Sequence, residues 1–512
     1  MLPQNNPDSL AQLLDFSASQ SPLRTAVYFN DQEITYDTLK VSSDRLSQGL
    51  VNLGVKKENV AILLHNGIEF IISYFSAVKA SCAAVPINNM FKEEEIEYIL
   101  DDSKATVVIS SVEFLSVLIS IKAKSASLKY IILTDALTPE TLNFYEIIER
   151  SPGKKNSIIL SPDDIATILY TSGTTGRPKG AMLTHKNLLS NVSSCLNAVD
   201  VSGKDNFICL LPMFHSFAWT VCVLMPLYIG AGLTVVDSLR PFRKLIRNVV
   251  RKKVTVFIGI PSIFHILSQI QIPAVFTARV LRMIDPLRFC ISGAAALPKE
   301  VLSEFQAKFK VPLLEGYGLT EASPVVSLNP LKGKQKPQSV GVPLRGVEVK
   351  IEDGELLVKG LNVMKGYFND PDATNEAIKD GWLYTGDIAK IDEDGYIYIV
   401  DRKKEMINVR GLNVYPKEVE NILLGYPNIK EVAVVKYFDK NKGEVPRAFV
   451  VLNDPKTQFM PREAIKFCRQ HLAEFKIPKT FEVVNKLPKN TLGKVLKKDL
   501  EHISSLGGAT NP

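Results

Sequence analysis

Short, continuous apolar runs alternate with helical patterns over the first 400 residues. The apolar runs lie at residues 60–64, 106–110, 166–170, 207–211, 254–260 and 287–292. The first of them, for example, is followed by a helical pattern at residues 69–79. A strand that is apolar at every position is buried on both faces, which is typical of parallel sheets covered by helices. The pattern therefore predicts α/β layers.

The pattern changes after about residue 340. Short runs at 347–351, 355–358 and 396–400, with Asp-Gly at 353–354 and 394–395, predict a more antiparallel, β-rich subdomain. A charged junction at 401–404 precedes a compact α+β pattern, with helices near 417–424 and 462–474 and strands at 431–435 and 447–452. We expect an α/β fold with a large N-terminal domain, residues 1–401, and a small α+β C-terminal domain, residues 402–512.

The composition indicates a globular protein with more than one domain. The 512 residues exceed what a single core usually holds. The chain has no apolar run of about 18 residues and no basic-then-apolar N-terminal pattern, so neither a transmembrane span nor a secretory signal is expected. Six scattered cysteines without a CxxC pair fit buried thiols in a reducing compartment. These features predict a cytoplasmic location.

The charge is distributed unevenly along the chain. Residues 402–512 carry 21 Lys and Arg against 12 Asp and Glu, whereas the first 401 residues carry 40 against 42. A C-terminal segment with a net charge of +9 fits an anionic partner such as a nucleotide, coenzyme A or an acidic carrier protein. No recognised nucleic-acid-binding motif accompanies this charge, and nucleic acid is not expected.

A loop rich in glycine and hydroxyl groups, TSGTTGRPKG at 171–180, follows an apolar strand. Its glycines let backbone N–H groups converge, its hydroxyls can donate to phosphate oxygens, and Lys179 can neutralise a polyphosphate. The spacing is not that of a Walker A loop. Taken alone, the loop fits either a phosphate site or a surface turn. Its candidate phosphate-binding residues are Thr171, Ser172, Gly173, Thr174, Thr175, Gly176 and Lys179.

The loop closely resembles the phosphate-loop signature of the adenylate-forming superfamily, which comprises acyl-CoA synthetases, luciferases and peptide-synthetase adenylation domains. Further blocks follow in the order of that family and span nearly the whole chain: LPMFHSFAW at 211–219, SGAAALP at 292–298, EGYGLTEASP at 315–324, GWLYTGD at 381–387, DRKKEMINVRGLNVYP at 401–416 and LPKNTLGKVLKKDL at 487–500. The similarity points to fatty acyl-CoA or fatty acyl-carrier-protein ligases.

The resemblance implies an ATP site assembled from several of these blocks. Tyr317 would stack on adenine, Thr320 would bond the α-phosphate, and Asp387 would accept both ribose hydroxyls. Glu321 would hold Mg²⁺ together with substrate phosphates, as is usual for this cation. The ATP- or AMP-binding set is completed by Gly293, Ala294, Ala295, Glu315, Gly316, Gly318, Ile399 and Arg402.

The resemblance also implies an acyl pocket and a catalytic lysine. Lys494 would reach the ATP site, where its ammonium would offset the charge that builds up as a carboxylate attacks the α-phosphate. Thr320, Glu321 and His215 are the other residues expected in catalysis. Trp219 is placed like the indole that gates the acyl tunnel of fatty acyl synthetases. The residues expected to border the acyl pocket are His215, Trp219, Gly293 and Gly318.

The block at 401–416 resembles the interdomain hinge of the family. Lys404 aligns with the pivot and Gly411 with the loop for thioester formation, while Asn408 and Arg410 depart from the residues that many relatives carry there. The C-terminal domain is therefore expected to be mobile and to rotate about Lys404 between two steps. The first step would convert a carboxylic acid and ATP to acyl-AMP and pyrophosphate. In the second step a thiol would attack and release AMP.

A basic segment stands apart from these blocks. Residues 240–253 carry seven cations and no acid, and their spacing predicts an amphipathic helix. The face is either simply solvated, or it docks coenzyme A phosphates, an acidic acyl carrier protein with its phosphopantetheine thiol, or anionic lipid. The cations on this face are Arg240, Arg243, Lys244, Arg247 and Arg251.

Several functions remain open at the level of sequence. Coenzyme A and a carrier protein are rival thiol acceptors. A fatty acid is the expected substrate because of Trp219 and its aliphatic surroundings, with aryl acids as the alternative. Two further classes are luciferase-like oxidation of the adenylate and a nucleotide-binding pseudo-ligase. The intact set of Lys494, Glu321 and Asp387 argues against the pseudo-ligase.

Overall fold

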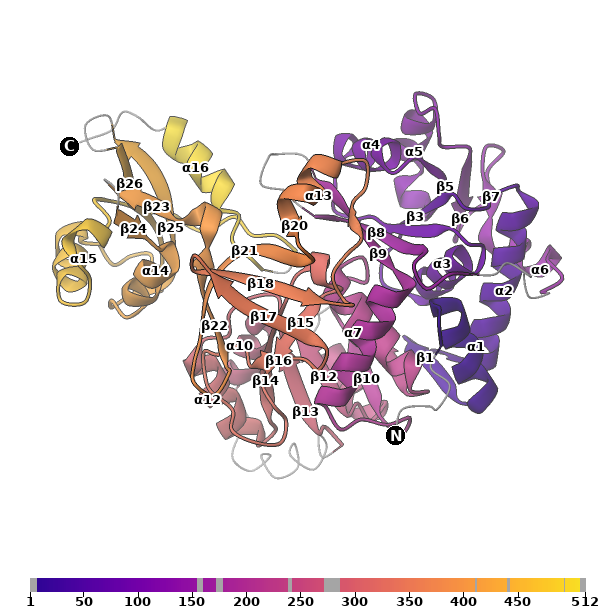
Figure 1. Cartoon of the computed structure of the whole chain (residues 1–512), viewed down its shortest axis with the longest axis horizontal. Helices are drawn as coiled ribbons and strands as arrows, with labels where there is room; N and C mark the ends of the chain where they lie inside the picture. The colour runs from indigo at the N-terminus through magenta and orange to yellow at the C-terminus, as the bar shows by residue number, and fades with distance from the viewer. Residues whose placement is uncertain are drawn as a thin grey trace. The chain divides into compact units, whose positions relative to one another are not determined.

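The structure, a computed structural model, forms two compact units (Figure 1). It describes residues 7–153, 160–171, 178–237, 242–270, 286–409, 412–439, 443–491 and 493–506. Unit 1 comprises Met1–Val349 and Val358–Leu383, and unit 2 comprises Lys350–Leu357 and Tyr384–Pro512. The α/β fold with a large N-terminal and a small C-terminal part is confirmed. The expected domain boundary at 401/402 stays a prediction.

One sheet of unit 1 supports the candidate phosphate loop. Its order is β19-β9-β8-β4-β3-β5-β6-β7, and it is parallel from β8 through β4 to β7. The antiparallel hairpin β8–β9 carries the loop, and β19 pairs with the outer side of β9. The strand bounds are β3 Asn59–Leu63, β4 Ala83–Pro86, β5 Ala105–Ser110, β6 Tyr130–Leu133, β7 Leu142–Asn143, β8 Ile165–Thr171, β9 Lys179–Thr184 and β19 Gly366–Tyr367.

The second large sheet of unit 1 has the order β16-β15-β14-β13-β12-β10-β11-β1-β2. The strands from β14 to β1 are parallel, and antiparallel pairs lie at both edges. Every apolar run predicted as a strand before residue 300 falls on a strand of one of the two sheets. The bounds are β1 Thr25–Phe29, β2 Gln32–Thr35, β10 Asn206–Cys209, β11 Gly232–Val235, β12 Val256–Gly259, β13 Phe289–Ser292, β14 Leu313–Gly318, β15 Val325–Leu328 and β16 Val342–Pro343.

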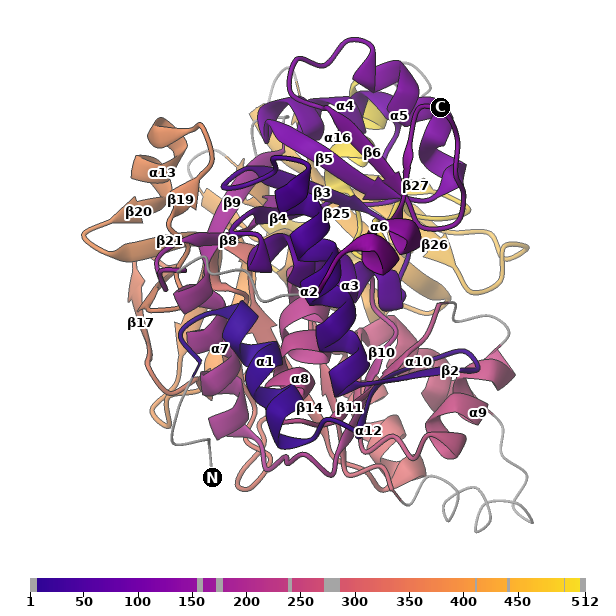
Figure 2. The same ribbon diagram turned by 90° about the vertical axis from the view of Figure 1, so that its right-hand side faces the viewer.

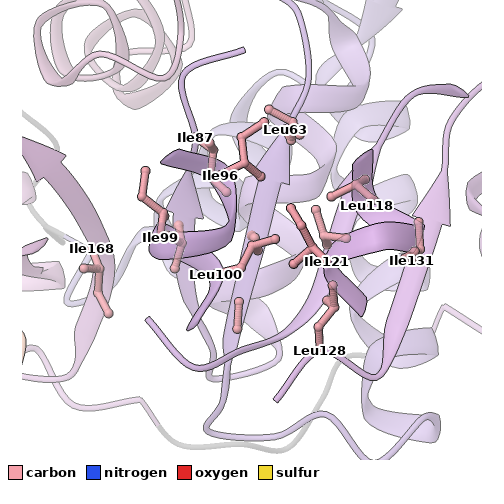
Figure 3. Packing of buried hydrophobic residues seen from close by; sticks show 14 of the residues in the cluster. Leu63, Ile87, Ile96, Ile99, Leu100, Leu118, Ile121, Leu128, Ile131 and Ile168 are labelled. Carbon is pink, nitrogen blue, oxygen red and sulfur yellow. The ribbon is translucent and has the colours of Figure 1, made fainter. Parts of the chain in front are cut away.

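Two helices close one face of the first sheet. In α4 (Glu93–Asp102) the apolar positions Ile96, Ile99 and Leu100 share one face, and α5 (Leu115–Lys122) contributes Leu118 and Ile121 (Figure 3). These side chains pack against buried residues of the strands, and burial of this kind supplies most of the stability of an amphipathic helix. Three glutamates in the first turn of α4 complement its N-terminal dipole.

Three N-terminal helices of unit 1 meet around a buried lysine. Helices α1 (Leu10–Gln20), α2 (Tyr36–Asn52) and α3 (Ile68–Lys79) lie side by side in Figures 1 and 2. Lys79 ends α3 with its side chain only 7% exposed, and its Nζ lies 2.6 Å from Asp15 Oδ1 and also contacts Asp44. The second carboxylate oxygen of Asp44 pairs with Lys40. Charges this deeply buried require their partners.

Unit 2 contains the β-rich part that follows residue 350 and the C-terminal α+β part. Strand β22 (Ile397–Arg402) pairs with β21 (Trp382–Ile391), and β25-β26-β27 form a sheet covered by α14 and α15. Helix α15 (Pro461–Arg469) ends earlier than the predicted 474. The remaining bounds are β17 Val347–Glu352, β18 Glu355–Gly360, β23 Ile407–Val409, β24 Leu412–Val414, α14 Pro416–Leu424, β25 Ile429–Asp439, β26 Gly443–Leu452, β27 Thr480–Val483 and α16 Lys497–Leu506.

The early segment Lys350–Leu357 is fixed to unit 2 by a buried carboxylate. Glu355 Oε1 accepts from the Gly386 backbone N–H at 2.8 Å, and Lys403 Nζ lies 2.8 Å from Glu355 Oε2. Both partners come from later parts of unit 2. Unit 2 therefore depends on this early segment, which residues 358–383 separate from the rest of the unit in the chain.

The predicted basic helix is present as α9 (Phe242–Arg251). Leu245 and Val249 are buried, whereas Arg247 and Arg251 are exposed. Lys244 pairs with Asp237 at 3.0 Å. Arg240 and the Arg243 side chain lie outside the part that the structure describes. Across the described chain, no helix is both long and apolar enough to cross a bilayer.

Replacing Lys79 with Met should lower the free energy of unfolding by about 3 kcal/mol, because the buried ammonium that pairs with both Asp15 and Asp44 is lost. Urea denaturation measures the loss. Lys40→Met is the matched control, since Lys40 is 30% exposed and pairs with the same Asp44, and it should cost less than about 1 kcal/mol. Equal losses in the two variants would contradict the proposed importance of burial.

Candidate active site

The hairpin β8–β9 brings the two described ends of the phosphate loop together. Thr171 is paired with Lys179 across the hairpin. Gly180 follows Lys179 at a crowded position, because a Cβ there would lie 2.7 Å from Ile168 Cγ2. The residues between the two ends lie outside the described chain, and their role stays a prediction: Ser172, Gly173, Thr174, Thr175 and Gly176.

Glu321 forms a junction between three segments of unit 1. It lies in a short 3₁₀ helix, Thr320–Ala322. The Thr171 hydroxyl donates to Glu321 Oε1 at 3.2 Å, and the Tyr367 hydroxyl donates to the same oxygen at 3.0 Å. Burial, together with the neighbouring carboxylate, raises the pKa of Tyr367, so its hydroxyl remains a donor at neutral pH.

Tyr367 also lies beside the lysine at the end of the loop. Lys179 Nζ is 5.4 Å from the centre of the Tyr367 ring and 3.8 Å from Asp370 Oδ2. Asp370 caps helix α13 (Pro371–Ala377) by accepting from the Ala373 N–H. No local sequence pattern indicated Tyr367 or Asp370, because it is the pairing of β19 with β9 that places them beside the loop.

The motif block at 315–324 meets the segment at 211–220 through hydroxyl groups. The hydroxyls of Thr320 and Ser216 are 3.0 Å apart, and Thr220 donates to the Ser323 carbonyl at 3.0 Å. Gly316, Tyr317 and Gly318 lie on β14, paired with β15. Gly318 cannot be replaced there without movement of the backbone, because a Cβ would lie 2.1 Å from the Pro324 carbonyl oxygen.

Glu315 connects the 292–298 turn to β14. Its Oε1 accepts from the Leu297 N–H at 2.8 Å, while its buried Oε2 has no hydrogen-bond partner among the described residues. Burial raises the pKa of Glu315 to about 7. In the same turn Gly293 is buried, with the Phe217 ring against its Cα, whereas Ala294 and Ala295 are exposed.

His215 and Trp219 lie in different surroundings. His215 is half-buried and its Nδ1 accepts from the Phe217 N–H at 3.3 Å. Desolvation lowers the pKa of His215 to about 4, so the imidazole is neutral at physiological pH. Trp219 is 2% exposed in a π-helical segment, Ala218–Leu224, with its ring centre 4.1 Å from that of Tyr74. Its expected role at the acyl pocket stays a prediction.

Unit 2 holds the candidate ribose carboxylate and the candidate catalytic lysine. Asp387 is almost fully buried, and its Oδ1 lies 2.9 Å from Arg402 Nε across the β21–β22 pair, in which Ile399 faces Ala389. Desolvation and then the Arg402 charge lower the pKa of Lys494 to about 8. Asp387 also acts electrostatically on Lys494, so the two candidates are neighbours within unit 2.

A tight turn presents Lys494. The backbone N–H of Asn490 donates to the Lys494 carbonyl at 2.8 Å, and the Asn490 side chain accepts from the Lys494 N–H at 2.9 Å. Gly493 supplies the positive φ of 76° that the turn requires. Lys404, the expected pivot, is exposed, and its pKa is lowered by desolvation and by Arg402. Gly411 lies outside the described residues.

The carboxylate of Glu321 suits a Mg²⁺ ion that is held mainly by the phosphates of a nucleotide. Glu321 Oε1 accepts hydrogen bonds from two hydroxyls. Within the described residues no three His, Cys, Asp or Glu side chains are grouped to form a metal site. Mg²⁺ bound by one carboxylate and by nucleotide phosphates needs no such group.

The AMP-binding enzyme family matches residues 14–368, and the AMP-binding enzyme C-terminal domain matches residues 418–494. The chain belongs to the AMP-binding enzyme family. This membership confirms the adenylate-forming superfamily, and the chain is a ligase that uses ATP and coenzyme A.

Proteins named as CoA ligases match almost the whole chain. It is 33% identical to a long-chain-fatty-acid–CoA ligase of Bacillus subtilis, with 96% of this chain and 94% of that protein covered. It is also 33% identical to 4-coumarate–CoA ligase 1 of Solanum tuberosum, with 92% and 89% covered. The crystal structure of ATP-bound MatB from Rhodopseudomonas palustris superposes with a TM-score of 0.88 at 29% identity, covering 97% and 99%.

Replacing Tyr367 with Phe should slow acyl-adenylate formation by about tenfold, since a hydrogen bond to a charged carboxylate is lost. ATP–pyrophosphate exchange measures this step, while conversion of supplied acyl-AMP should be unchanged. Tyr145→Phe is the control because it removes a similar tyrosine–glutamate bond, to Glu69, in which no candidate residue takes part. A loss of the same size in both variants would show that the Glu321 bond has no special role.

Proposed function

We propose that the chain activates a fatty acid as acyl-AMP and transfers the acyl group to coenzyme A. The observation that carries this proposal is the ion pair of Asp387 Oδ1 and Arg402 Nε at 2.9 Å, together with Lys494, which the Gly493 turn presents and which interacts electrostatically with both residues. A lysine with a pKa near 8 is still mostly protonated at neutral pH, so its ammonium can interact with anions. This is the environment needed where negative charge develops.

In the first step a carboxylate oxygen attacks the α-phosphorus of ATP and the bond to pyrophosphate breaks. The acid is ionised at neutral pH, so no general base is required. Lys494 and Thr320 would stabilise the α-phosphoryl oxygens, Lys179 would neutralise the departing pyrophosphate, and Asp387 would orient the ribose. Glu321 would hold Mg²⁺, which offsets phosphate charge when bound. Positioning and charge stabilisation therefore account for the catalysis.

In the second step the thiol sulfur attacks the carbonyl carbon of acyl-AMP. The bond from that carbon to the AMP oxygen breaks, and the thiol proton is released. The neutral His215 lies in the same block as Ser216, which contacts Thr320, so it could border the acyl carbonyl. Rotation about Lys404 would exchange the Lys494 side of the C-terminal domain for its Gly411 side.

A fatty acid is favoured over an aryl acid. The identity of the chain to relatives named for the two kinds of acid is the same, 33%, so identity does not separate them. The match to the long-chain-fatty-acid ligase covers more of both proteins. Trp219 packs against the rings of Tyr74 and Phe70, and such an aromatic surface suits an apolar acyl chain.

ATP–pyrophosphate exchange with a panel of acids tests this function. Fatty acids of graded chain length should stimulate exchange, and 4-coumarate and benzoate should stimulate it at least about tenfold less. Lys494→Ala should abolish the stimulated exchange. A preference for the aryl acids would overturn the choice of acid, and an absence of exchange with every acid would overturn the ligase reaction itself.

A carrier protein is the second candidate acceptor, and helix α9 is the observation that favours it. Its buried residues Leu245 and Val249 fix the helix on unit 1, so that the exposed guanidinium groups of Arg247 and Arg251 face solvent. A rigid basic face of this kind complements an acidic carrier protein.

Reversing both charges, Arg247→Glu with Arg251→Glu, should raise the apparent KM for an acyl carrier protein by about tenfold or more. ATP–pyrophosphate exchange and the reaction with free coenzyme A should be unaffected. Lys56→Glu with Lys57→Glu changes two exposed lysines elsewhere on unit 1 and serves as the control. Unchanged kinetics with both thiols would exclude docking on α9.

A further inference from the structure

A second lysine anchors the turn that carries Lys494. Lys497 is the first residue of α16, and its side chain is 15% exposed. Its Nζ lies 2.8 Å from Glu420 Oε1 and 3.0 Å from Glu405 Oε2, and these carboxylates are 7% and 20% exposed. Burial alone would lower the pKa of Lys497, but the two carboxylates reverse this effect and raise it. Lys497 therefore stays charged.

Glu405 lies between the two lysines. It ends the 3₁₀ helix Lys403–Glu405, directly after the expected pivot Lys404. Its carboxylate is bonded to Lys497 and also interacts electrostatically with Lys494. Glu405 is thus held in an ion pair by Lys497, while Lys494 interacts with the same carboxylate electrostatically.

The connection between the two lysines is short. Lys494 and Lys497 are three residues apart, and the strand-like stem of the turn is closed by the Leu496 N–H, which donates to the Pro488 carbonyl at 2.9 Å. Glu420 is itself held in place, because it accepts from the Val434 N–H at 2.9 Å. The start of α16 is consequently fixed beside Glu420 and Glu405.

We propose that Lys497 is a positioning residue for acyl-adenylate formation, which acts by holding Glu405 in an ion pair and so keeping that carboxylate from capturing the ammonium of Lys494. A captured ammonium would be neutralised by a carboxylate of the protein before it reached the nucleotide. The inference rests on the proposed role of Lys494. It assigns to Lys497 and Glu405 a function that the adenylate-forming resemblance did not imply.

The test separates the two half-reactions. Lys497→Met should lower the kcat of ATP–pyrophosphate exchange by about tenfold or more, with the KM for ATP changed by less than about threefold. Conversion of supplied acyl-AMP to thioester should keep its rate within about threefold, because that step does not need Lys494 at the nucleotide. Lys497→Arg keeps the charge and should retain most of the exchange activity.

A second substitution distinguishes capture from a loss of structure. In the Lys497→Met background, Glu405→Gln removes the competing carboxylate and should restore exchange to within about threefold of the unmodified protein. A purely structural role of Lys497 predicts instead that the double variant is as slow as Lys497→Met or slower. Absence of rescue, or equal losses in both half-reactions, would overturn the proposal.

Glu405→Gln alone gives an independent arm should Lys497→Met fail to fold. Lys494 is then influenced by Arg402 and Lys404, which lower its pKa, and by Asp387, which raises it. Because Glu405 also raises that pKa, its removal should move the alkaline limb of the exchange rate to lower pH. The rate below that limb should be unchanged. An unmoved limb would overturn the proposal.

Lys476→Met is the matched control. Lys476 forms an ion pair of similar geometry in unit 2, 2.7 Å from Glu418, with a side-chain exposure of 23%. Its loss should leave both half-reactions unaffected, and equal losses here and at Lys497 would overturn the proposal. If Lys494→Ala left exchange intact, the proposed role of Lys494 would be wrong irrespective of the result for Lys497.

Discussion

The arrangement of the candidate nucleotide site depends on the hydrogen bonds that one carboxylate oxygen receives. Glu321 Oε1 is shared by the Thr171 and Tyr367 hydroxyls, which come from opposite ends of the edge β8-β9-β19. A half-buried carboxylate that has lost water needs such donors as its hydrogen-bond partners. The same contacts fix the phosphate loop at its beginning and place Tyr367 beside the lysine at its end. The candidate metal ligand, the candidate phosphate loop and the pairing of β19 with β9 are therefore linked by the same hydrogen bonds.

Lys494 has surroundings of mixed charge. Arg402 and Lys404 favour loss of its proton, whereas Asp387 and Glu405 favour its retention. The balance leaves a lysine whose pKa is lowered to about 8, so that it is still mostly charged at neutral pH and can attract an incoming polyanion. Acidic side chains therefore lie among the basic residues of the C-terminal segment. They raise the pKa of Lys494 and form ion pairs with Lys497.

The sequence predicted those parts of the fold and site that are encoded within short segments. The buried strands, the amphipathic helix α9 and the motif blocks each carry their own pattern of residues. Tyr367, Glu405 and Glu420 could not be found in this way, because their partners are far away in sequence and only strand pairing or helix packing brings them together. Lys79 shows the same limit: a lysine at the end of a helical pattern predicts solvent exposure, yet α1 and α2 supply two carboxylates that bury it. Ion pairs between different helices and strands can thus not be predicted from the residues next to each partner in the sequence.

The early segment of unit 2 has a consequence for recombination between homologous ligases. Glu355 is bonded to Gly386 and Lys403, so a hybrid made with one crossover after residue 383 would combine the glutamate of one parent with the backbone and lysine of the other. A crossover before residue 350 would keep these three partners together, but it would transfer β19 and Tyr367 as well. Shuffling of C-terminal modules in such enzymes is therefore expected to work best between parents that share an acidic residue at position 355.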